Sequence, residues 1–247
     1  RDRDVLRKVK AEIEELVARI EKVSRDALSE VKRLLDENRK IAEDVLRLIE
    51  SLLRKIRDTR GDDEVVKETE EVLRDNHRLL EELIRRLIKV LEEWLRRHKK
   101  LLDEIRELLK EILRLVKESG VSEDLLRRLK RVIEELDKKL KESEEKLRRV
   151  VEKAKEDLKA VLEEHRKVLE DLKRALEEVR EKLRERGRDH MVLHEYVNAA
   201  GITEEMKRVH DDLSRAVEKV VRDVVRVDKE LLDELARILR RLEEVIT

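Results

Sequence analysis

The chain has 247 residues, 51% of them charged, and 63 basic residues balance 63 acidic ones to a net charge of zero. That balance argues against a nucleic-acid or membrane partner, and no apolar run reaches the about 18 residues that a membrane span needs. Cysteine is absent, which excludes disulfides and zinc–thiolate sites. Proline and phenylalanine are absent too, which is unusual for a natural globular domain. We expect a soluble, cytoplasmic monomer without a signal peptide.

Three glycines divide the chain into four segments. Gly61, Gly120 and Gly187 each follow a long periodic stretch, and a short polar residue comes soon after each of them. Glycine supplies the left-handed residue that ends a helix, and Asp or Ser caps the start of the next helix. The predicted helices span residues 2–58, 63–118, 123–185 and 189–247. Because the loops between them are short, neighbouring helices are expected to run antiparallel.

Apolar residues recur at alternating spacings of three and four in every segment, which places them on one face of each helix. In the first segment, for example, this stripe passes through Val45, Leu48 and Leu52. The opposite faces carry Glu, Lys and Arg at helical spacing, as solvated surfaces do. The sequence therefore predicts an all-α fold, a single-chain antiparallel four-helix bundle with long helices, forming one domain over residues 1–247.

Several polar residues occupy positions within these apolar stripes. Those predicted to form buried hydrogen-bond layers are Asn38, Asn76, His98, Ser143, His165 and His210. Antiparallel folding brings Ser24, His98 and Ser143 to one level. It brings His165 and His210 to a second level, near the two asparagines. His77 is expected at the solvent edge, and Trp94 is expected to fill the core.

Three interpretations of these polar residues compete. Buried hydrogen-bond layers would fix the order and register of the helices. A metal site would combine histidines with carboxylates, but the Glu-x-x-His spacing of di-iron bundles does not occur. A catalytic group would need an orienting partner and a pocket, and no motif marks one. We favour the first interpretation, and expect no enzyme activity, no cofactor and no metal.

Residues 188–203, RDHMVLHEYVNAAGIT, differ in composition from the rest of the chain. They include the only Tyr, and Glu195 is the single charged residue between positions 191 and 200. Apolar residues alternate along this stretch as in a strand. One face of that strand would carry Met191, Leu193, Glu195 and Val197. A glutamate centred on an otherwise apolar face needs a polar partner.

All sixteen residues of this stretch resemble the eleventh strand of green fluorescent protein, in the engineered form that serves as the small fragment of a split fluorescent protein. His194, Tyr196 and Asn198 match that engineered form rather than the natural strand. The resemblance implies a partner, the large fragment made of strands 1–10. It also implies that the strand face defined above binds inside that barrel, with Glu195 at the chromophore. Without the large fragment, the chain is not expected to fluoresce.

The same stretch also continues the helical stripe of the fourth segment. Traced backwards from Met206, the stripe passes through Ile202 or Thr203 without a change of phase. The residues predicted to hold the stretch against the bundle are Val192, Tyr196, Ala199 and Thr203. A helix from Asp189 would match the first two helices in length, whereas one beginning at Glu204 would be about four turns shorter. We therefore expect residues 188–203 to form part of the fourth helix, as its least stable part.

Outside this stretch, the composition and single-glycine loops resemble those of computationally designed helical bundles with buried polar networks. This resemblance implies a synthetic cage whose last helix hides a peptide until a competing designed helix, a second expected partner, displaces it. The predicted function is a protein switch that sequesters residues 188–203 and releases them to the large fragment. The alternative is an inert scaffold that displays the peptide in a loop over residues 187–201. An enzyme or metalloprotein built on the histidines is a third hypothesis.

Overall fold

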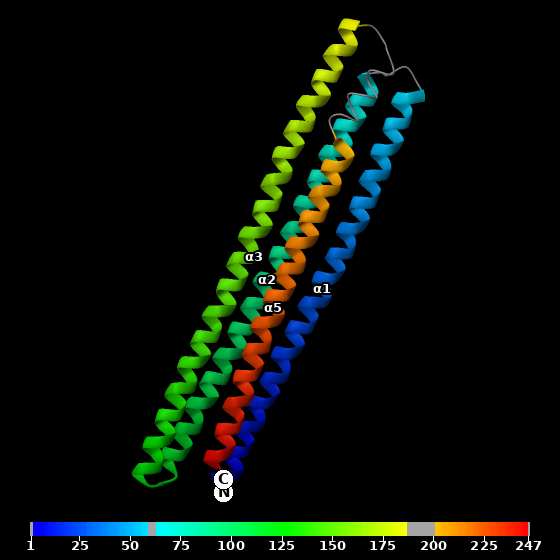
Figure 1. Cartoon of the computed structure of the whole chain (residues 1–247). Coiled ribbons are helices and arrows are strands. Elements are labelled where there is room, and N and C mark those ends of the chain that lie inside the picture. Colours follow the sequence, from blue (N-terminus) through cyan, green and yellow to red (C-terminus); the bar gives the residue numbers. More distant parts are fainter. Residues whose placement is uncertain (1, 59–62, 187–200, 247) are drawn as a thin grey trace. The chain divides into compact units, whose positions relative to one another are not determined.

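The computed structural model of this protein describes residues 2–58, 63–186 and 201–246. Four α-helices account for almost all of them (Figure 1). They are α1 (Asp2–Asp58), α2 (Asp63–Glu118), α3 (Glu123–Arg186) and α5 (Ile202–Ile246). No strand occurs in these three ranges, and the helices pack against one another. The prediction of an all-α four-helix bundle is therefore confirmed.

Contacts between the helices define two compact units. Unit 1 contains residues 1–30, 89–154 and 220–247, and unit 2 contains residues 31–88 and 155–219. The sequence predicts one domain, and each of these two units takes one part from every helix. Long helices produce this grouping because a side chain contacts only residues near its own position along the helix axis.

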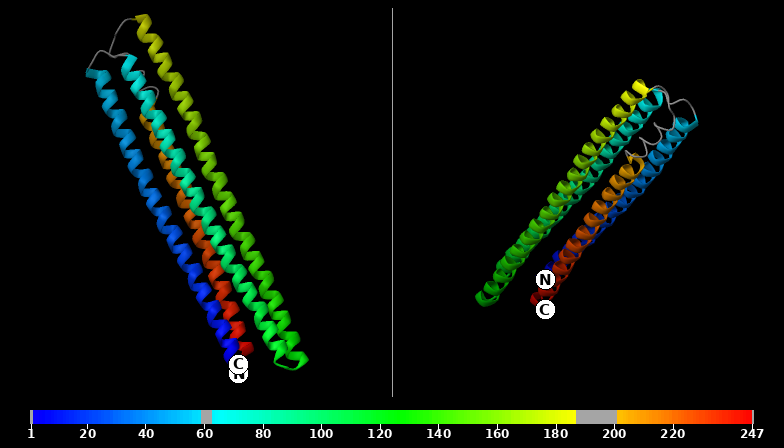
Figure 2. Two further views of the ribbon diagram at one scale, coloured as in Figure 1. Left: turned by 180° about the vertical axis from the view of Figure 1, so that it is seen from behind. Right: turned by 45° about the horizontal axis from the view of Figure 1, so that its top comes forward.

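Within unit 1, α1 runs antiparallel to α5, and α2 runs antiparallel to α3. Lys10, near the start of α1, forms an ion pair with Glu243, near the end of α5. Figures 1 and 2 show the N-terminal part of α1 beside the C-terminal part of α5 from three directions. Arg106 of α2 similarly pairs with Asp137 of α3 across the connection at Gly120, with 2.6 Å between Nε and Oδ1.

The predicted apolar stripes form the buried core of each unit. Among the most deeply buried side chains are Ile13, Ile20, Leu140 and Leu235 in unit 1, and Leu34, Leu83, Met206 and Leu213 in unit 2. One position of the predicted stripe is wrong. Leu48 is 52% exposed, whereas its neighbour Ile49 is 1% exposed. Successive residues lie about 100° apart around a helix, and the rotation of α1 that buries Ile49 turns Leu48 toward solvent.

The predicted break at Gly120 is present. Gly120 has a φ of 71°, a conformation that glycine adopts without steric penalty, and it follows the last turn of α2. Ser122 then caps α3, because its hydroxyl accepts a hydrogen bond from the backbone N–H of Leu125 at 3.4 Å. Its carbonyl accepts the bond from Leu126 that opens the helix, at 3.1 Å.

The start of α5 differs from the prediction of an uninterrupted helix from Asp189. Gly201 has a φ of 63°, and its carbonyl accepts the first helical hydrogen bond, from the N–H of Glu205, at 2.9 Å. A left-handed residue cannot lie inside a continuous right-handed helix, so α5 begins at Ile202. It has 45 residues, against 57 in α1.

The peptide itself lies largely beyond the described part of the chain. Its predicted barrel-facing residues (Met191, Leu193, Glu195, Val197) and three of its predicted caging residues (Val192, Tyr196, Ala199) fall within residues 187–200, outside the described residues. The fourth caging residue, Thr203, is half-buried, and Ile202 beside it is fully buried. The sequence left both residues open as the stripe position, and Ile202 is the one that faces the core.

Candidate functional site

Four polar side chains from three helices meet inside unit 1, and we call them the unit 1 cluster. Ser24 comes from α1, Trp94 and His98 from α2, and Asp228 from α5. Trp94 and His98 are four residues apart, so they share one face of α2, and their ring centroids lie 4.4 Å apart. His98 is 0% exposed, and the Asp228 side chain is 14% exposed.

The hydrogen bonds of the unit 1 cluster determine which atoms carry protons. His98 Nδ1 lies 2.9 Å from the carbonyl oxygen of Trp94, which can only accept, so Nδ1 carries a hydrogen. Ser24 donates its hydroxyl proton to Asp228 Oδ1 at 2.6 Å and accepts from Trp94 Nε1 at 3.1 Å. His98 Nε2 lies 3.1 Å from Ser24 Oγ and 3.3 Å from Asp228 Oδ1, and both of these oxygens accept. The geometry therefore fits an imidazolium at His98 paired with the carboxylate of Asp228.

A serine, a histidine and an aspartate also form the catalytic triad of hydrolases, but the arrangement here is different. In a triad the carboxylate accepts from one ring nitrogen, and the other nitrogen accepts the serine proton. In the unit 1 cluster, Ser24 and Asp228 both lie at Nε2, and the backbone of Trp94 occupies Nδ1. With a hydrogen on Nε2 as well as on Nδ1, the ring has no lone pair that could act as a base toward the hydroxyl. The hydrogen bonds of the cluster join α1, α2 and α5.

A second group of polar side chains lies in unit 2, and we call it the unit 2 cluster: Asn38, Asn76, His77, His165, His210 and Ser214. Asn38 Nδ2 donates to Ser214 Oγ at 3.1 Å, which leaves Asn38 Oδ1 to accept from His210 Nδ1 at 2.8 Å. His210 Nε2 then accepts from Asn76 Nδ2 at 3.1 Å. Both amides thus hold His210 in its neutral form.

Burial agrees with that assignment. Desolvation lowers the pKa of His210 to about 4, and the negative charge of Asp211 opposes the shift only in part. His210 connects three helices, because its two partners on the ring come from α1 and α2.

The other two histidines of the unit 2 cluster pair with each other. Nδ1 of His77 lies 2.6 Å from Nδ1 of His165, and the rings are stacked with an interplanar angle of 8°. Only one of two facing nitrogens can carry the proton of that hydrogen bond. Burial, followed by the neighbouring rings of His77 and His210, lowers the pKa of His165 to about 3. Burial also lowers the pKa of His77.

The unit 2 cluster is incompletely hydrogen-bonded, unlike the unit 1 cluster. Asn76 Oδ1 and His165 Nε2 are both buried, and neither has a hydrogen-bond partner among the described residues. A buried polar atom without a partner destabilises the folded state by roughly 1–3 kcal/mol. The unit 2 cluster therefore holds its helices less firmly than the number of its polar residues suggests.

The structure brings most of the predicted layer residues together, with three differences. Ser143 is half-buried and is not among the residues of the unit 1 cluster, whose further partner is Asp228 of α5. His77 keeps 15% exposure at the solvent edge, and it also stacks on His165, a contact that the sequence did not predict. Thr69, also in a stripe, bonds to the carbonyl of Val65 in its own helix at 2.8 Å and links no helices.

Sequence reasoning missed Asp228 and Ser214. Asp228 follows Val224 by four residues and precedes Leu231 by three, so it continues the core spacing of α5. That spacing is the signal that would have placed a charged residue at the core. Ser214 follows the core residue Leu213 directly and carries no such signal.

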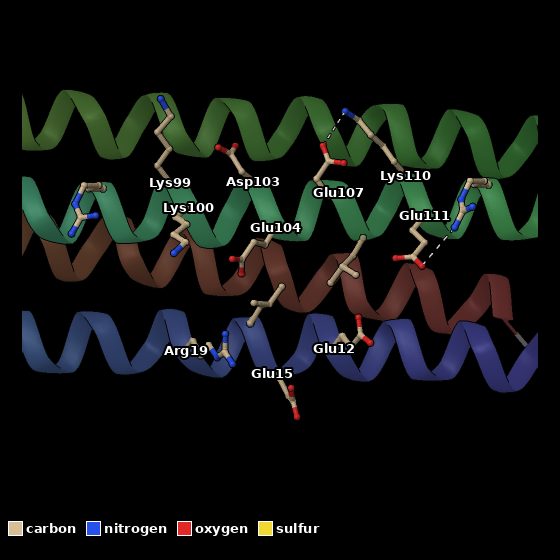
Figure 3. A pocket seen from close by; sticks show the side chains of 14 residues that line it. Glu12, Glu15, Arg19, Lys99, Lys100, Asp103, Glu104, Glu107, Lys110 and Glu111 are labelled. Carbon is tan, nitrogen blue, oxygen red and sulfur yellow. Dashed lines mark ion pairs between the residues drawn. The ribbon is translucent and has the colours of Figure 1, made fainter.

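A groove of about 1160 Å³ runs between α1 and α2 in unit 1 (Figure 3). Glu12, Glu15 and Arg19 line it from α1, and the other labelled side chains come from α2. Its charges are of both signs and partly paired within α2, as in the ion pair of Lys110 with Glu107 at 3.6 Å. A groove whose charges neutralise each other has no preference for a cation or an anion, so we do not regard it as a ligand site.

Two further results bear on the class of protein. No group of three or more metal-binding side chains suited to an ion occurs in residues 2–58, 63–186 and 201–246. Over the same ranges, no helix combines the length and apolar character needed to cross a membrane. Comparison of the chain with family models, with curated proteins and with solved structures found no match.

Proposed function

We propose that this chain is a designed cage that shields residues 188–203 and releases them to complete a split fluorescent protein. The sixteen-residue resemblance supplies the chemistry of the partner, the large fragment of strands 1–10. Strand addition requires the peptide to be extended and free along one edge. Any contact that holds the peptide on the bundle therefore competes with complementation.

One observation carries the proposal. On α1, α2 and α3 of unit 2, apolar side chains stay buried past the level at which α5 begins. Ile202 lies eight residues before His210, whose ring is bonded to Asn38 and Asn76. Eight residues from Asn38 and from Asn76, in the same direction along the bundle, lie residue 46 of α1 and residue 68 of α2. Ile202 is therefore roughly level with these two residues.

Apolar side chains remain buried past that level. Leu52 of α1 is 6% exposed, Val66 of α2 is 1% exposed, and Leu176 of α3 is 1% exposed. Buried apolar side chains need a covering layer, and each contributes roughly 1.5–3 kcal/mol when covered. The segment between Arg186 and Ile202 connects α3 to α5 within unit 2, so we assign the cover to it. Met191, Val192, Leu193 and Val197 give it the apolar side chains for that role.

Gly201 gives the proposed release a hinge. Its left-handed conformation separates the peptide from the hydrogen-bond ladder of α5. Release of residues 188–203 then opens only the first turn of α5, where Ile202 and Thr203 lie, while Asn38 and Asn76 hold the rest of the helix through His210. The shielding contacts alone set the free energy of release, and a tenfold lower availability corresponds to about 1.4 kcal/mol.

The test is the rate of fluorescence recovery on mixing with the large fragment, compared with that of the free peptide of residues 188–203. We expect recovery at least about tenfold slower for the intact chain, and equal rates would contradict the proposal. A matched pair of bundle variants leaves the peptide sequence unchanged. Leu52→Glu should speed recovery because it charges the covering surface, whereas Leu48→Glu, at a 52% exposed position of the same helix, should not.

One observation favours the alternative function, a scaffold that displays the peptide. α5 is shorter than α1 and begins directly after a left-handed glycine, as expected where a loop enters a helix. A displayed peptide would complement at the rate of the free peptide in both Leu52→Glu and the unmodified chain. Limited proteolysis adds a second readout, because an exposed loop would be cleaved first at Arg184, Arg186 or Arg188.

A further inference from the structure

We propose that the unit 2 cluster is an acid-sensitive lock: protonation of His77, His165 and His210 breaks hydrogen bonds between the helices of unit 2 while those of unit 1 persist. The inference concerns the stability of unit 2 and does not rest on the function proposed for the peptide. It rests on which atoms face each ring nitrogen in the two clusters.

His210 cannot accept a second proton without losing a partner. Its Nδ1–H already donates to Asn38 Oδ1, and its Nε2 accepts from the amide nitrogen of Asn76. A proton on Nε2 would point directly at the two hydrogens of Asn76 Nδ2. Rotating the Asn76 amide would turn Oδ1 toward the ring and leave Nδ2 to find a new acceptor in the core. In either case the bonded arrangement that joins α2 to α5 is disturbed.

The pair of His77 and His165 has the same property. One proton fits between the two facing Nδ1 atoms, which are 2.6 Å apart, but two protons do not. Two imidazolium rings stacked at 4.9 Å between centroids would also repel each other. Full protonation therefore separates α2 from α3 at this position.

Few charged groups near these rings favour their protonation. Glu81 of α2 lies 4.0 Å from His77 Nε2, while Arg166 of α3 opposes protonation of the same ring. His165 is affected by the rings of His77 and His210, which both disfavour its charge. Asp211 of α5 acts on His210, and α1 contributes the uncharged amide of Asn38. In the unit 1 cluster, by contrast, both nitrogens of His98 face acceptors, among them the carboxylate of Asp228.

The direction of the pH effect follows from the two lowered pKa values. An unfolded or opened histidine binds its proton near pH 6.5, whereas burial lowers the pKa to about 4 for His210 and about 3 for His165. Between these values the opened state binds more protons, so the stability of unit 2 falls as the pH falls below about 6.5. Down to about pH 5 most carboxylates stay ionised, which assigns the loss to histidine in that window.

Hydrogen exchange of the full chain, followed by mass spectrometry at pH 7 and pH 5, tests the proposal. After correction for the intrinsic exchange rates, amides of residues 34–50, 66–86, 160–176 and 206–216 should open more at pH 5. The shift of His210 alone predicts a rise of roughly 20-fold in the opening equilibrium, and His165 a similar one. Amides in residues 8–28, 92–114 and 224–240 of unit 1 should change by less than about threefold. An equal response of both units, or no response of unit 2, would overturn the proposal.

Two variants make the test specific to the rings. His165→Leu removes a titrating ring, so the acid response of unit 2 should shrink by about 20-fold whatever the variant does to stability at pH 7. Thr69→Val is the control, because it also removes a buried polar group from unit 2 but no ring. An unchanged acid response in His165→Leu would contradict the inference. Exchange is measured without the large fragment, so failure of the peptide to be caged leaves this result unaffected.

Discussion

Each unit contains a buried histidine, His98 in unit 1 and His210 in unit 2, but the two rings have different partners. In unit 1 a carboxylate, a hydroxyl and a backbone carbonyl surround His98, and all of them accept hydrogen bonds from it. In unit 2 two amides hold His210. Asn38 accepts a hydrogen bond from Nδ1, and Asn76 donates one to Nε2. The comparison shows that the partners of a buried imidazole decide which of its nitrogens face acceptors and which face donors.

The two clusters also differ in what holds them together. In the unit 1 cluster the carboxylate of Asp228 lies 3.3 Å from Nε2 of the buried His98, and removing either side chain would leave the other without its partner. The unit 2 cluster contains neutral groups and already has two buried atoms without partners. We therefore expect single substitutions to affect unit 1 more strongly than unit 2.

The largest effect is expected for Asp228→Asn. The amide keeps the size of the side chain but removes the charge that balances the imidazolium of His98, so unfolding should become easier by about 3 kcal/mol. Chemical denaturation at pH 7 measures the change. Asp233→Asn, on an exposed position of α5, is the control and should shift stability by less than about 0.5 kcal/mol. Equal effects of the two variants would show that no buried ion pair exists.

An intermediate effect is expected for Asn38→Leu in unit 2. The change leaves His210 Nδ1–H without an acceptor and should reduce stability by about 2 kcal/mol. Replacing Asn38, Asn76 and His210 together by Leu leaves no polar group of this set without a partner. The triple variant should therefore regain most of the stability that Asn38→Leu loses. If the triple variant were less stable than Asn38→Leu, the two amides would stabilise the fold by more than the hydrogen bonds they make with His210.

The smallest effect is expected for Thr69→Val. Its hydroxyl bonds only to the carbonyl of Val65, which already lies inside the same helix, so no contact between helices is lost. Thermal unfolding should change by no more than about 0.5 kcal/mol in equivalent free energy. A change as large as that of Asn38→Leu would mean that Thr69 takes part in the unit 2 cluster.

Much of this architecture could be read from the sequence, because helical period and glycine breaks are local signals. The predicted breaks at Gly61 and Gly120 locate the end of α1, both ends of α2 and the start of α3 to within three residues. The polar interruptions of the stripe identified His98, His165 and His210 as buried positions. These inferences needed only the spacing of residues along one helix.

What the sequence could not supply depends on the rotation of one helix against another. Leu48 and Ile49 are equally apolar, and only packing decides which of them is buried. His77 lies at the partly exposed edge that its spacing predicts, but only the packing of α2 and α3 shows that it stacks on His165. The left-handed conformation of Gly201 was missed because Ile202 and Met206 kept the helical phase up to it.

Trp94 is the chain's single tryptophan, and it lies against His98 inside unit 1. Its indole emission therefore reports on unit 1 and does not report on unit 2. An acid titration followed by this emission should remain flat through the pH range in which exchange in unit 2 accelerates. The placement of one aromatic residue thus lets an ordinary fluorimeter tell partial opening from complete unfolding, with no added label.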